Sequence, residues 1–380
     1  MPEDQPSTGA ATGSGKRLRV VLLSPARAAV SGVSTHANML FGSTLAQDFE
    51  LLHFEVGSEG RDESRARALG RLATTPARFA AFLLRERPEV VHINTSTVPR
   101  SWWRDLAYHL VARALGRRVI YQVHGGLLPA DLFSDRRLSA LLRHTLETAD
   151  VVVVLSEEER RAYQAFSPKI RVALVPNAIP VAPFQAAEAR TARLDGPLRL
   201  VYVGRLVATK GLFEIVEGLR LALDAGLRAS LRVAGSGPDE AALRERIAAS
   251  KLESHVSLLG PIFGEAKDAL WLDSDVFVFP TFHPEGLPYA ILESMAAGCV
   301  PLTCPKAAIP DVIQDGVHGV FVPPRDAPAL AAALLRLDGD RAALWRMAQA
   351  GRARVLERYT IPRLAEAFAA LYRGEDLRGG

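Results

Sequence analysis

The hydrophobic positions of this chain form short runs of Val, Ile and Leu that alternate with longer amphipathic stretches. Short apolar runs are typical of strands that are buried on both faces of a sheet. The amphipathic stretches of ten or more residues between them predict helices with one buried face. The alternation therefore predicts an α/β fold in which helices cover both faces of parallel sheets.

Twelve apolar runs are candidate strands, and they divide evenly about residue 178. The first six are residues 18–24, 51–56, 89–94, 118–123, 150–155 and 171–176. The second six are residues 198–203, 230–234, 255–259, 275–280, 300–303 and 317–322. This count predicts two doubly wound, Rossmann-like domains.

The length of 380 residues also favours two domains over one. We expect residues 1–16 to be a disordered leader, because they are polar and rich in Gly, Ser and Thr. The remaining boundaries that we predict are a first domain over 17–177, a linker over 178–197, a second domain over 198–359 and a C-terminal helical segment over 360–380. The helical segment has an apolar face and is expected to pack back on the first domain.

Composition excludes several classes of protein. Hydrophobic residues make up 48% and charged residues 23%, which is the composition of a folded globular chain. No apolar run reaches the roughly 20 residues that a membrane helix needs, and no secretion signal opens the chain, so we expect a cytoplasmic protein. Cys299 and Cys304 lack neighbouring metal ligands, and the pattern predicts neither a zinc site nor a disulfide framework.

The basic residues are concentrated in the first half of the chain. Residues 1–195 hold 25 Lys and Arg against 20 Asp and Glu, whereas residues 196–380 hold 21 against 22. The chain has no zinc-finger spacing and no aromatic RNA-binding signature, so a nucleic acid is not an expected partner. An anionic small molecule or an anionic membrane surface fits the charge better.

The segment 284–298 carries the strongest chemical signal. A buried-looking strand ends at Pro280, a loop carries Glu285, and Pro288 opens a helix whose first N–H groups are free to bind an anion. Glu293 lies about one and a half turns into that helix and can face the same crevice as Glu285. The alternative is that both carboxylates are solvated surface charges.

Gly204, Arg205 and Lys210 form a second candidate group directly after the first strand of the second domain. Ligands of open α/β sheets bind at the carboxyl ends of the strands, where a rigid guanidinium and an ammonium can clamp a diphosphate. An ordinary solvated loop is the alternative, since Arg and Lys are common on protein surfaces.

Two signals in the first domain are weaker. Ser31 and Gly32 follow the opening strand, and small residues there allow a phosphate or sugar to approach the backbone. His124 closes a strand beside two glycines, which places its imidazole at the carboxyl edge of the sheet. The alternative for His124 is a structural hydrogen-bonding role.

Taken in order along residues 17–373, these motifs resemble those of the family 4 retaining glycosyltransferases, which have the two-domain GT-B fold. The resemblance rests on Gly32, His124, Ser156, Val175-Pro176-Asn177, Gly204-Arg205, Lys210-Gly211, Gly235-Ser236-Gly237 and the pair Glu285 and Glu293. The chain departs from the family pattern at Ser31, where a glycine is common, and in Asn177-Ala178-Ile179-Pro180, which replaces the usual Asn-Gly-Val-Asp.

The resemblance implies that the two domains face a cleft, with a UDP- or GDP-sugar bound by the second domain and a glycan or polyprenyl-linked acceptor by the first. It implies catalytic roles for His124, Glu285, Arg205 and Lys210. It implies donor binding by Gly32, Gly204, Arg205, Lys210, Gly235, Glu285, Gly286, Leu287 and Glu293. The implied reaction is hexosyl transfer with retention of configuration, in cell-surface polysaccharide or glycolipid synthesis, without a metal or a cofactor. The alternative is a nucleotide-sugar epimerase of the same architecture.

Asp273 and Asp275 have the spacing of the Asp-x-Asp metal motif that is found in a different glycosyltransferase fold. Because they end a helix and enter a strand, they lie at the edge of the sheet opposite the expected ligand site. Solvated charge at a helix end is the interpretation that this position favours.

The acceptor side gives three further candidates, Ser31, Trp102 and Trp103. Residues 61–87 carry seven arginines against three acids, and Leu69, Leu72, Phe79, Phe82 and Leu83 form an apolar stripe. Such a helix either lies on anionic lipid, at the inner face of the plasma membrane, or packs on the sheet with a solvated basic back.

Overall fold

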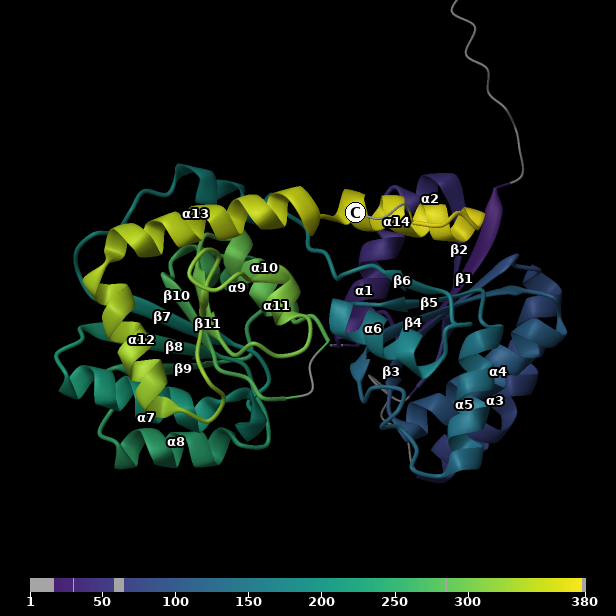
Figure 1. The fold of residues 1–380 in the computed structure, drawn as a ribbon, viewed down its shortest axis with the longest axis horizontal. Coiled ribbons are helices and arrows are strands. Elements are labelled where there is room, and N and C mark those ends of the chain that lie inside the picture. Colours follow the sequence, from purple (N-terminus) through teal and green to yellow (C-terminus); the bar gives the residue numbers. More distant parts are fainter. Residues whose placement is uncertain (1–16, 30, 58–64, 284–285, 378–380) are drawn as a thin grey trace, which may run out of the picture.

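The computed structural model describes residues 17–29, 31–57, 65–283 and 286–377, with the backbone alone for 65–73. The predicted disordered leader therefore lies outside the described residues. The described part of the chain forms two lobes, each built on a parallel six-stranded sheet with helices on both faces (Figure 1). The expected α/β fold class is thus confirmed.

The first sheet has the strand order β2-β1-β3-β4-β5-β6. Its strands are β1 (Leu18–Ser24), β2 (Phe49–Glu55), β3 (Val90–Thr97), β4 (Arg118–Gly126), β5 (Val151–Val154) and β6 (Val172–Leu174). The helices of this lobe are α1 (Gly32–Phe41), α2 (Leu45–Asp48), α3 (Arg65–Glu86), α4 (Pro99–Ala114), α5 (Arg136–Thr148) and α6 (Glu157–Phe166). All six predicted strands are present, and their bounds shift by at most a few residues.

The second sheet has the strand order β12-β11-β10-β7-β8-β9. Its strands are β7 (Leu198–Val203), β8 (Ala229–Ala234), β9 (Val256–Gly260), β10 (Val276–Phe279), β11 (Val300–Thr303) and β12 (Val320–Phe321). Its α-helices are α7 (Leu212–Asp224), α8 (Glu240–Ala249), α9 (Gly264–Leu272), α10 (Tyr289–Ala296), α11 (Ile309–Val312), α12 (Ala327–Gly339) and α13 (Arg341–Arg358). The 3₁₀ helix η2 (Ala208–Lys210) lies between β7 and α7. The predicted second set of strands is present as well.

Each sheet changes its winding direction once, between β1 and β3 in the first lobe and between β7 and β10 in the second. At such a switch point the loops leaving two adjacent strands run to opposite faces and open a crevice at the carboxyl edge. The loops after β7 and β10 carry the two strongest candidate motifs of the sequence. The topology therefore brings these motifs together.

The chain crosses between the lobes twice. The first crossing contains the 3₁₀ helix η1 (Ala182–Ala189), and the second joins α13 to α14 (Ile361–Arg373). The two crossings touch, because the Ile179 N–H donates to the Tyr359 carbonyl oxygen at 2.9 Å and Ile179 forms a bridge with Thr360. Helix α14 then lies over the first lobe (Figure 1), where Phe368 and Tyr372 are fully buried.

Candidate nucleotide-sugar site

The loops that follow β7, β8 and β10 pack on one another through their backbones. A Cβ on Gly235 would lie 1.8 Å from the Gly204 carbonyl oxygen, and one on Gly211 would lie 2.5 Å from the Pro280 carbonyl oxygen. Both positions have positive φ angles, +141° and +81°, which glycine adopts without strain. Gly235 thus serves the close packing of two loops, a role that the sequence alone did not indicate.

Two further hydrogen bonds join the β7 loop to the β10 loop. The Phe282 N–H donates to the Thr209 carbonyl oxygen at 2.9 Å, and Thr209 Oγ1 is 2.9 Å from His283 Nδ1. Arg205 is exposed in this loop, and the Lys210 ammonium lies 5.4 Å from the centre of the Phe279 ring. The basic pair therefore sits on a loop that is fixed to Phe282 and His283 of the loop after β10.

Helix α10 begins after Pro288, which has no side-chain hydrogen bond to the first turn. The Ile291 N–H donates to the Pro288 carbonyl oxygen at 3.1 Å, so the two N–H groups that can bind an anion in this first turn are those of Tyr289 and Ala290. Glu285 lies outside the described residues, so the structure does not place that carboxylate. Gly286 and Leu287 are described, and Leu287 is buried in the core of the second lobe.

Glu293 is not a solvated helix charge, because its carboxylate is held by α9. Lys267 Nζ lies 2.7 Å from Oε1, and Trp271 Nε1 donates to Oε2 at 3.2 Å. The Glu293 side chain is 16% exposed to solvent. Each oxygen retains a lone pair for a further donor, so the carboxylate can still accept from hydroxyl groups. The sequence analysis missed Lys267 and Trp271, since neither belongs to a motif.

The first lobe meets this region at the start of α10. Asn177 Nδ2 donates to the Leu287 carbonyl oxygen at 2.7 Å, and Tyr289 Oη donates to Asn177 Oδ1 at 3.2 Å. Gly32, the first residue of α1, faces the same helix, because a Cβ on it would lie 3.8 Å from the Tyr289 ring. Ser31 caps α1 by accepting from the Ser34 N–H at 3.2 Å. The small residues 31 and 32 thus lie at the junction of the two lobes.

His124 lies near the end of β4, opposite the loop before α10. Its Nε2 is 2.8 Å from Asn94 Oδ1, and its ring meets His36 edge to face with centroids 4.8 Å apart. Burial lowers the pKa of His124 to about 3, so the ring is neutral at physiological pH. The structure thus brings His124 from one lobe to the loop that carries Gly286 in the other.

Behind His124, the polar groups continue into the core of the first lobe. Tyr372 Oη of α14 is 2.9 Å from His92 Nδ1, and His92 Nε2 is 2.8 Å from Gln122 Oε1. Phe368 stacks on His92 at 5.0 Å between ring centroids. Burial lowers the pKa of His92 to about 4. The C-terminal helix therefore supports the layer of side chains on which His124 rests.

The two tryptophans differ in their surroundings. Trp102 is 2% exposed and packs on Phe133 with ring centroids 4.9 Å apart. Its predicted contact with an acceptor is therefore wrong, because the first turns of α4 direct it into the core. Trp103 is 49% exposed and remains a candidate.

The predicted amphipathic helix is present as α3. Phe79 and Leu83 from its apolar stripe are fully buried in the core of the first lobe, and Phe82 packs against that core. Part of the stripe thus covers the sheet. Arg78 is exposed. The structure does not describe the side chains of the other predicted residues in the first part of α3, which are Arg65, Arg67, Leu69, Arg71 and Leu72. Among the described residues, no helix is long and apolar enough to cross a bilayer.

Asp273 and Asp275 lie at the opposite edge of the second sheet, as the sequence predicts. Asp273 pairs with Arg232 at 2.9 Å and with Arg199, and Asp275 pairs with Arg193 at 2.7 Å. Within the described part of the chain, no group of three or more His, Cys, Asp or Glu side chains is placed to bind a metal. These aspartates are thus partners of arginines.

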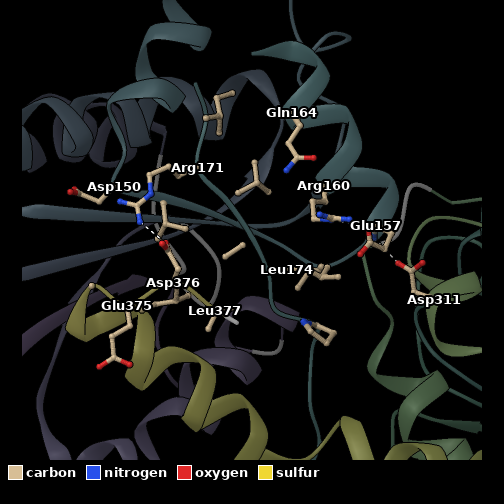
Figure 2. Close-up of a pocket in the computed structure, with 18 of the residues that line it drawn as sticks. Asp150, Glu157, Arg160, Gln164, Arg171, Leu174, Asp311, Glu375, Asp376 and Leu377 are labelled. Carbon is tan, nitrogen blue, oxygen red and sulfur yellow. Dashed lines mark hydrogen bonds and ion pairs between the residues drawn. The ribbon is translucent and has the colours of Figure 1, made fainter. Parts of the chain in front are cut away.

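A cavity of about 950 Å³ lies elsewhere, beside the crossings between the lobes. Figure 2 shows Gln164, Arg160 and Glu157 of α6 on one side and Asp376 and Leu377 of the C-terminal segment on another. The Asp311 carboxylate of the second lobe accepts from the Glu157 N–H at 2.7 Å. None of the predicted site residues lines this cavity, although Leu155, which does line it, contacts Gly286.

Comparisons with known proteins show which families the chain matches and which solved structures share its fold. Residues 16–178 match a family described as "Glycosyl transferase 4-like domain", and residues 197–340 match "Glycosyl transferases group 1". The amylovoran biosynthesis glycosyltransferase AmsK of Erwinia amylovora is 35% identical over 167 residues, which is 43% of this chain and 41% of that protein. The chain thus matches about two fifths of this relative.

A longer match is the alpha-D-kanosaminyltransferase of Streptomyces kanamyceticus, which is 27% identical over 70% of this chain and 72% of that protein. Among solved structures, Anabaena HepE in complex with UDP superposes with a TM-score of 0.75 at 15% identity, over 94% of this chain and 100% of that one. The same protein with UDP-glucose superposes with a TM-score of 0.73. These structures share the fold of this chain.

Proposed function

We propose that this chain, which belongs to the glycosyl transferases of group 1, moves a hexosyl group from a nucleoside diphosphate sugar to a glycan or polyprenyl-linked acceptor. The observation that carries the proposal is the junction at the second switch point. There, the β7 loop with its basic pair is bonded to the loop after β10, and Gly286, which precedes α10, lies against a neutral histidine of the other lobe. We further propose that transfer retains the anomeric configuration.

The donor is bound by the second lobe. Arg205 and Lys210 neutralise the diphosphate, and the first N–H groups of α10 add fixed donors. These groups act most strongly on the leaving nucleoside diphosphate, which gains charge in the transition state. Removing one such donor typically lowers the rate by about 100-fold to 1,000-fold. Binding of UDP and UDP-glucose by HepE, which shares the fold, supports a nucleotide-sugar donor.

The remaining donor contacts come from both lobes. Glu293 accepts from the ribose hydroxyls, with Lys267 and Trp271 holding its carboxylate in place. Glu285 and His124 contact the hydroxyls of the transferred sugar. This arrangement supplies positive charge to the leaving group from side chains and helix N–H groups, so we propose that transfer needs no metal ion.

The acceptor belongs to cell-surface polysaccharide or glycolipid synthesis. This part of the proposal is supported by the match to AmsK, which is named for amylovoran biosynthesis. The relatives named above are glycosyltransferases, and neither name supports the epimerase alternative. We place the reaction in the cytoplasm, at the inner face of the plasma membrane.

Attachment to that membrane is supported by three exposed apolar side chains on neighbouring helices. Leu84 of α3 is 57% exposed, and Trp103 and Leu110 of α4 are 49% and 55% exposed. Trp103 and Leu110 are seven residues apart and thus share one face of α4. Apolar side chains beside a basic helix face are typical of a surface that binds anionic lipid.

A donor screen tests the proposed function. The protein is heated with each of a panel of UDP- and GDP-sugars, because a ligand at about 100 times its dissociation constant adds about 2.7 kcal/mol of stability. The stabilising donor is then incubated with extracted polyprenyl-linked glycans, and transfer is read by mass spectrometry. Isomerised donor without acceptor would favour an epimerase, and no stabilisation by any donor would contradict the proposal.

A further inference from the structure

Asn94 of β3 has both ends of its amide engaged, although no motif marks it. It is 2% exposed. Its Nδ2 donates to the Leu23 carbonyl oxygen of β1 at 3.2 Å, and its Oδ1 faces His124 Nε2 of β4 at 2.8 Å. A backbone carbonyl oxygen only accepts, so the NH₂ group must point to Leu23 and the oxygen to His124. The neighbouring strand fixes which way the amide is turned.

This orientation decides which nitrogen of His124 carries the proton. An amide oxygen only accepts, so Nε2 of His124 must be the N–H donor. Among the described residues, the titratable side chains that face the His124 ring are His36 and His92. Neither carries a negative charge that would stabilise a second proton on His124. Burial keeps both of those rings neutral, since it lowers the pKa of each. The neutral His124 ring therefore has a bare lone pair on Nδ1.

Within the described part of the chain, Nε2 is the His124 nitrogen with a hydrogen-bond partner. Nδ1 is thus the nitrogen left for a ligand, and the His124 carbonyl oxygen lies against Gly286 at the junction of the lobes. A bare Nδ1 accepts a hydrogen bond from a hydroxyl group. It repels a carboxylate, which has no proton to give at neutral pH.

We propose that Asn94 is a positioning residue that holds His124 as its Nε2–H tautomer, so that Nδ1 accepts from a hydroxyl of the donor sugar and selects a neutral hexose over a uronic acid. The inference rests on the proposed function for the identity of the ligand. The tautomer itself is a property of the free protein. Asn94 does not touch the substrate and acts through His124.

The first experiment needs no variant of Asn94 and no substrate. Nitrogen-15 NMR of the histidine rings at pH 7 reports which nitrogen is protonated, and a His124→Gln spectrum identifies the His124 signals. We expect a neutral ring with a protonated Nε2. A protonated Nδ1, or a doubly protonated ring, would overturn the inference whatever the enzyme does.

The second experiment uses Asn94→Leu, which keeps the approximate size of the side chain and removes both hydrogen bonds. Wild type is assayed with the hexose donor found by the screen and with analogues that each lack one sugar hydroxyl. We expect one deoxy donor to lose about 10-fold or more in kcat/KM, the order expected for one lost hydrogen bond. Asn94→Leu should lose about as much on the full donor and show little further loss on that deoxy donor.

Tyr372→Phe is the matched control, since it removes a buried hydrogen bond to His92 and leaves Asn94 and His124 intact. Tyr372→Phe should show the same losses in kcat/KM as wild type on the deoxy donors, and the same His124 tautomer as wild type. If Asn94→Leu lowers activity equally on all donors, Asn94 is merely structural and the inference fails. Should Asn94→Leu not fold, Asn94→Ser takes its place. The NMR measurement of the His124 tautomer in wild type still tests the inference in that case.

The uronic acid arm tests selectivity. We expect wild type to use the corresponding UDP- or GDP-uronic acid at least about 10-fold less well than the hexose. Equal use of both donors would contradict the inference. If wild type transfers no sugar at all while His124 shows the expected tautomer, the proposed function fails and the positioning role of Asn94 stands, so the two failures are distinguishable.

Discussion

Gly286 of the second lobe lies directly on the backbone of His124 in the first. A Cβ on Gly286 would be 2.9 Å from the His124 carbonyl oxygen and 2.9 Å from Leu155 Cδ1. Real Cβ atoms do not approach a backbone oxygen this closely, and the contact joins residues 162 positions apart in sequence. Glycine is therefore required for the lobes to meet as they do.

Gly286→Ala should push the lobes apart at the candidate site. Because the contact lies where the lobes meet and the one core side chain that it touches, Leu155, can shift its terminal methyl group, we expect the thermal midpoint to stay within a few degrees of wild type. Transfer should slow by about 10-fold or more, since small displacements of reacting groups cost rate steeply. Steady-state kinetics with the screened donor measures this.

Gly339→Ala is the control for this change. No atom lies within 4 Å of a Cβ built there, and its φ is not in the left-handed region. It should leave turnover unchanged. Wild-type turnover in Gly286→Ala would show that the two lobes adjust without loss, which would contradict the prediction.

The acidic pair and His124 should separate donor binding from transfer. Glu293→Ala is expected to raise the dissociation constant of the donor about 10-fold or more, because a charged acceptor for its hydroxyls is lost. Glu285→Ala and His124→Ala should mainly lower kcat. Titration calorimetry and single-turnover assays distinguish the effects, and unchanged kcat in the last two variants would refute their roles.

Lys267→Met tests how the Glu293 carboxylate is held. The change removes the ammonium 2.7 Å from Oε1 and keeps the length of the side chain. Donor affinity should fall less than in Glu293→Ala, since Trp271 still donates to Oε2. Affinity equal to wild type would show that Lys267 has no part in positioning the carboxylate.

The transfer reaction is predicted to continue in excess chelator. Arg205, Lys210 and the start of α10 neutralise the leaving group in our proposal, and Asp273 and Asp275 are paired with arginines. The measurement is turnover after treatment with EDTA. Complete loss of turnover that Mg²⁺ restores would contradict the proposal and would favour Asp273 and Asp275 as metal ligands.

The buried histidines should make the free energy of unfolding decrease as the pH falls. The pKa of His92 falls from 6.5 to about 4, and that of His124 to about 3, because burial disfavours the charged rings. Between those values and 6.5 the unfolded chain binds more protons than the folded one, so the free energy of unfolding decreases as pH falls. Each ring contributes up to about 1.4 kcal/mol per pH unit.

Urea denaturation between pH 8 and pH 5 measures this slope. We expect little change above about pH 7 and a decline below about pH 6.5. His124→Gln should make the decline shallower, since one of the titrating rings is gone. Stability that rises on acidification through this range would show that the rings are not held neutral.

Membrane attachment is tested by sedimentation with anionic vesicles. A protein with Arg65, Arg67, Arg71 and Arg78 changed to Ser should partition less than wild type, because each basic side chain near an anionic surface contributes about 1 kcal/mol. Neutral vesicles and a protein with the distant Arg244 and Arg246 changed to Ser are the controls. Equal partitioning of wild type and the four-residue variant would remove the support for this surface.

Local pattern in the sequence was sufficient for the twelve strands and for the positions of the motifs. A buried strand needs a continuous apolar run, and the loop that follows it is at the carboxyl edge wherever the strand lies in a parallel sheet. Gly204, Arg205 and the start of α10 could be assigned to ligand-binding loops on this basis. The winding into two Rossmann-like sheets followed from the count and spacing of the runs.

Tertiary structure alone decided which side chains meet. Asn94 reaches His124 because β3 and β4 are neighbours, and Lys267 reaches Glu293 because α9 lies against α10, although each pair is 30 or 26 residues apart. Periodicity also could not tell that Trp102 turns inward while Trp103 stays exposed. Hydrophobic pattern records only whether a position is buried, whereas the partner of a buried polar group depends on strand order and on the packing of distant helices.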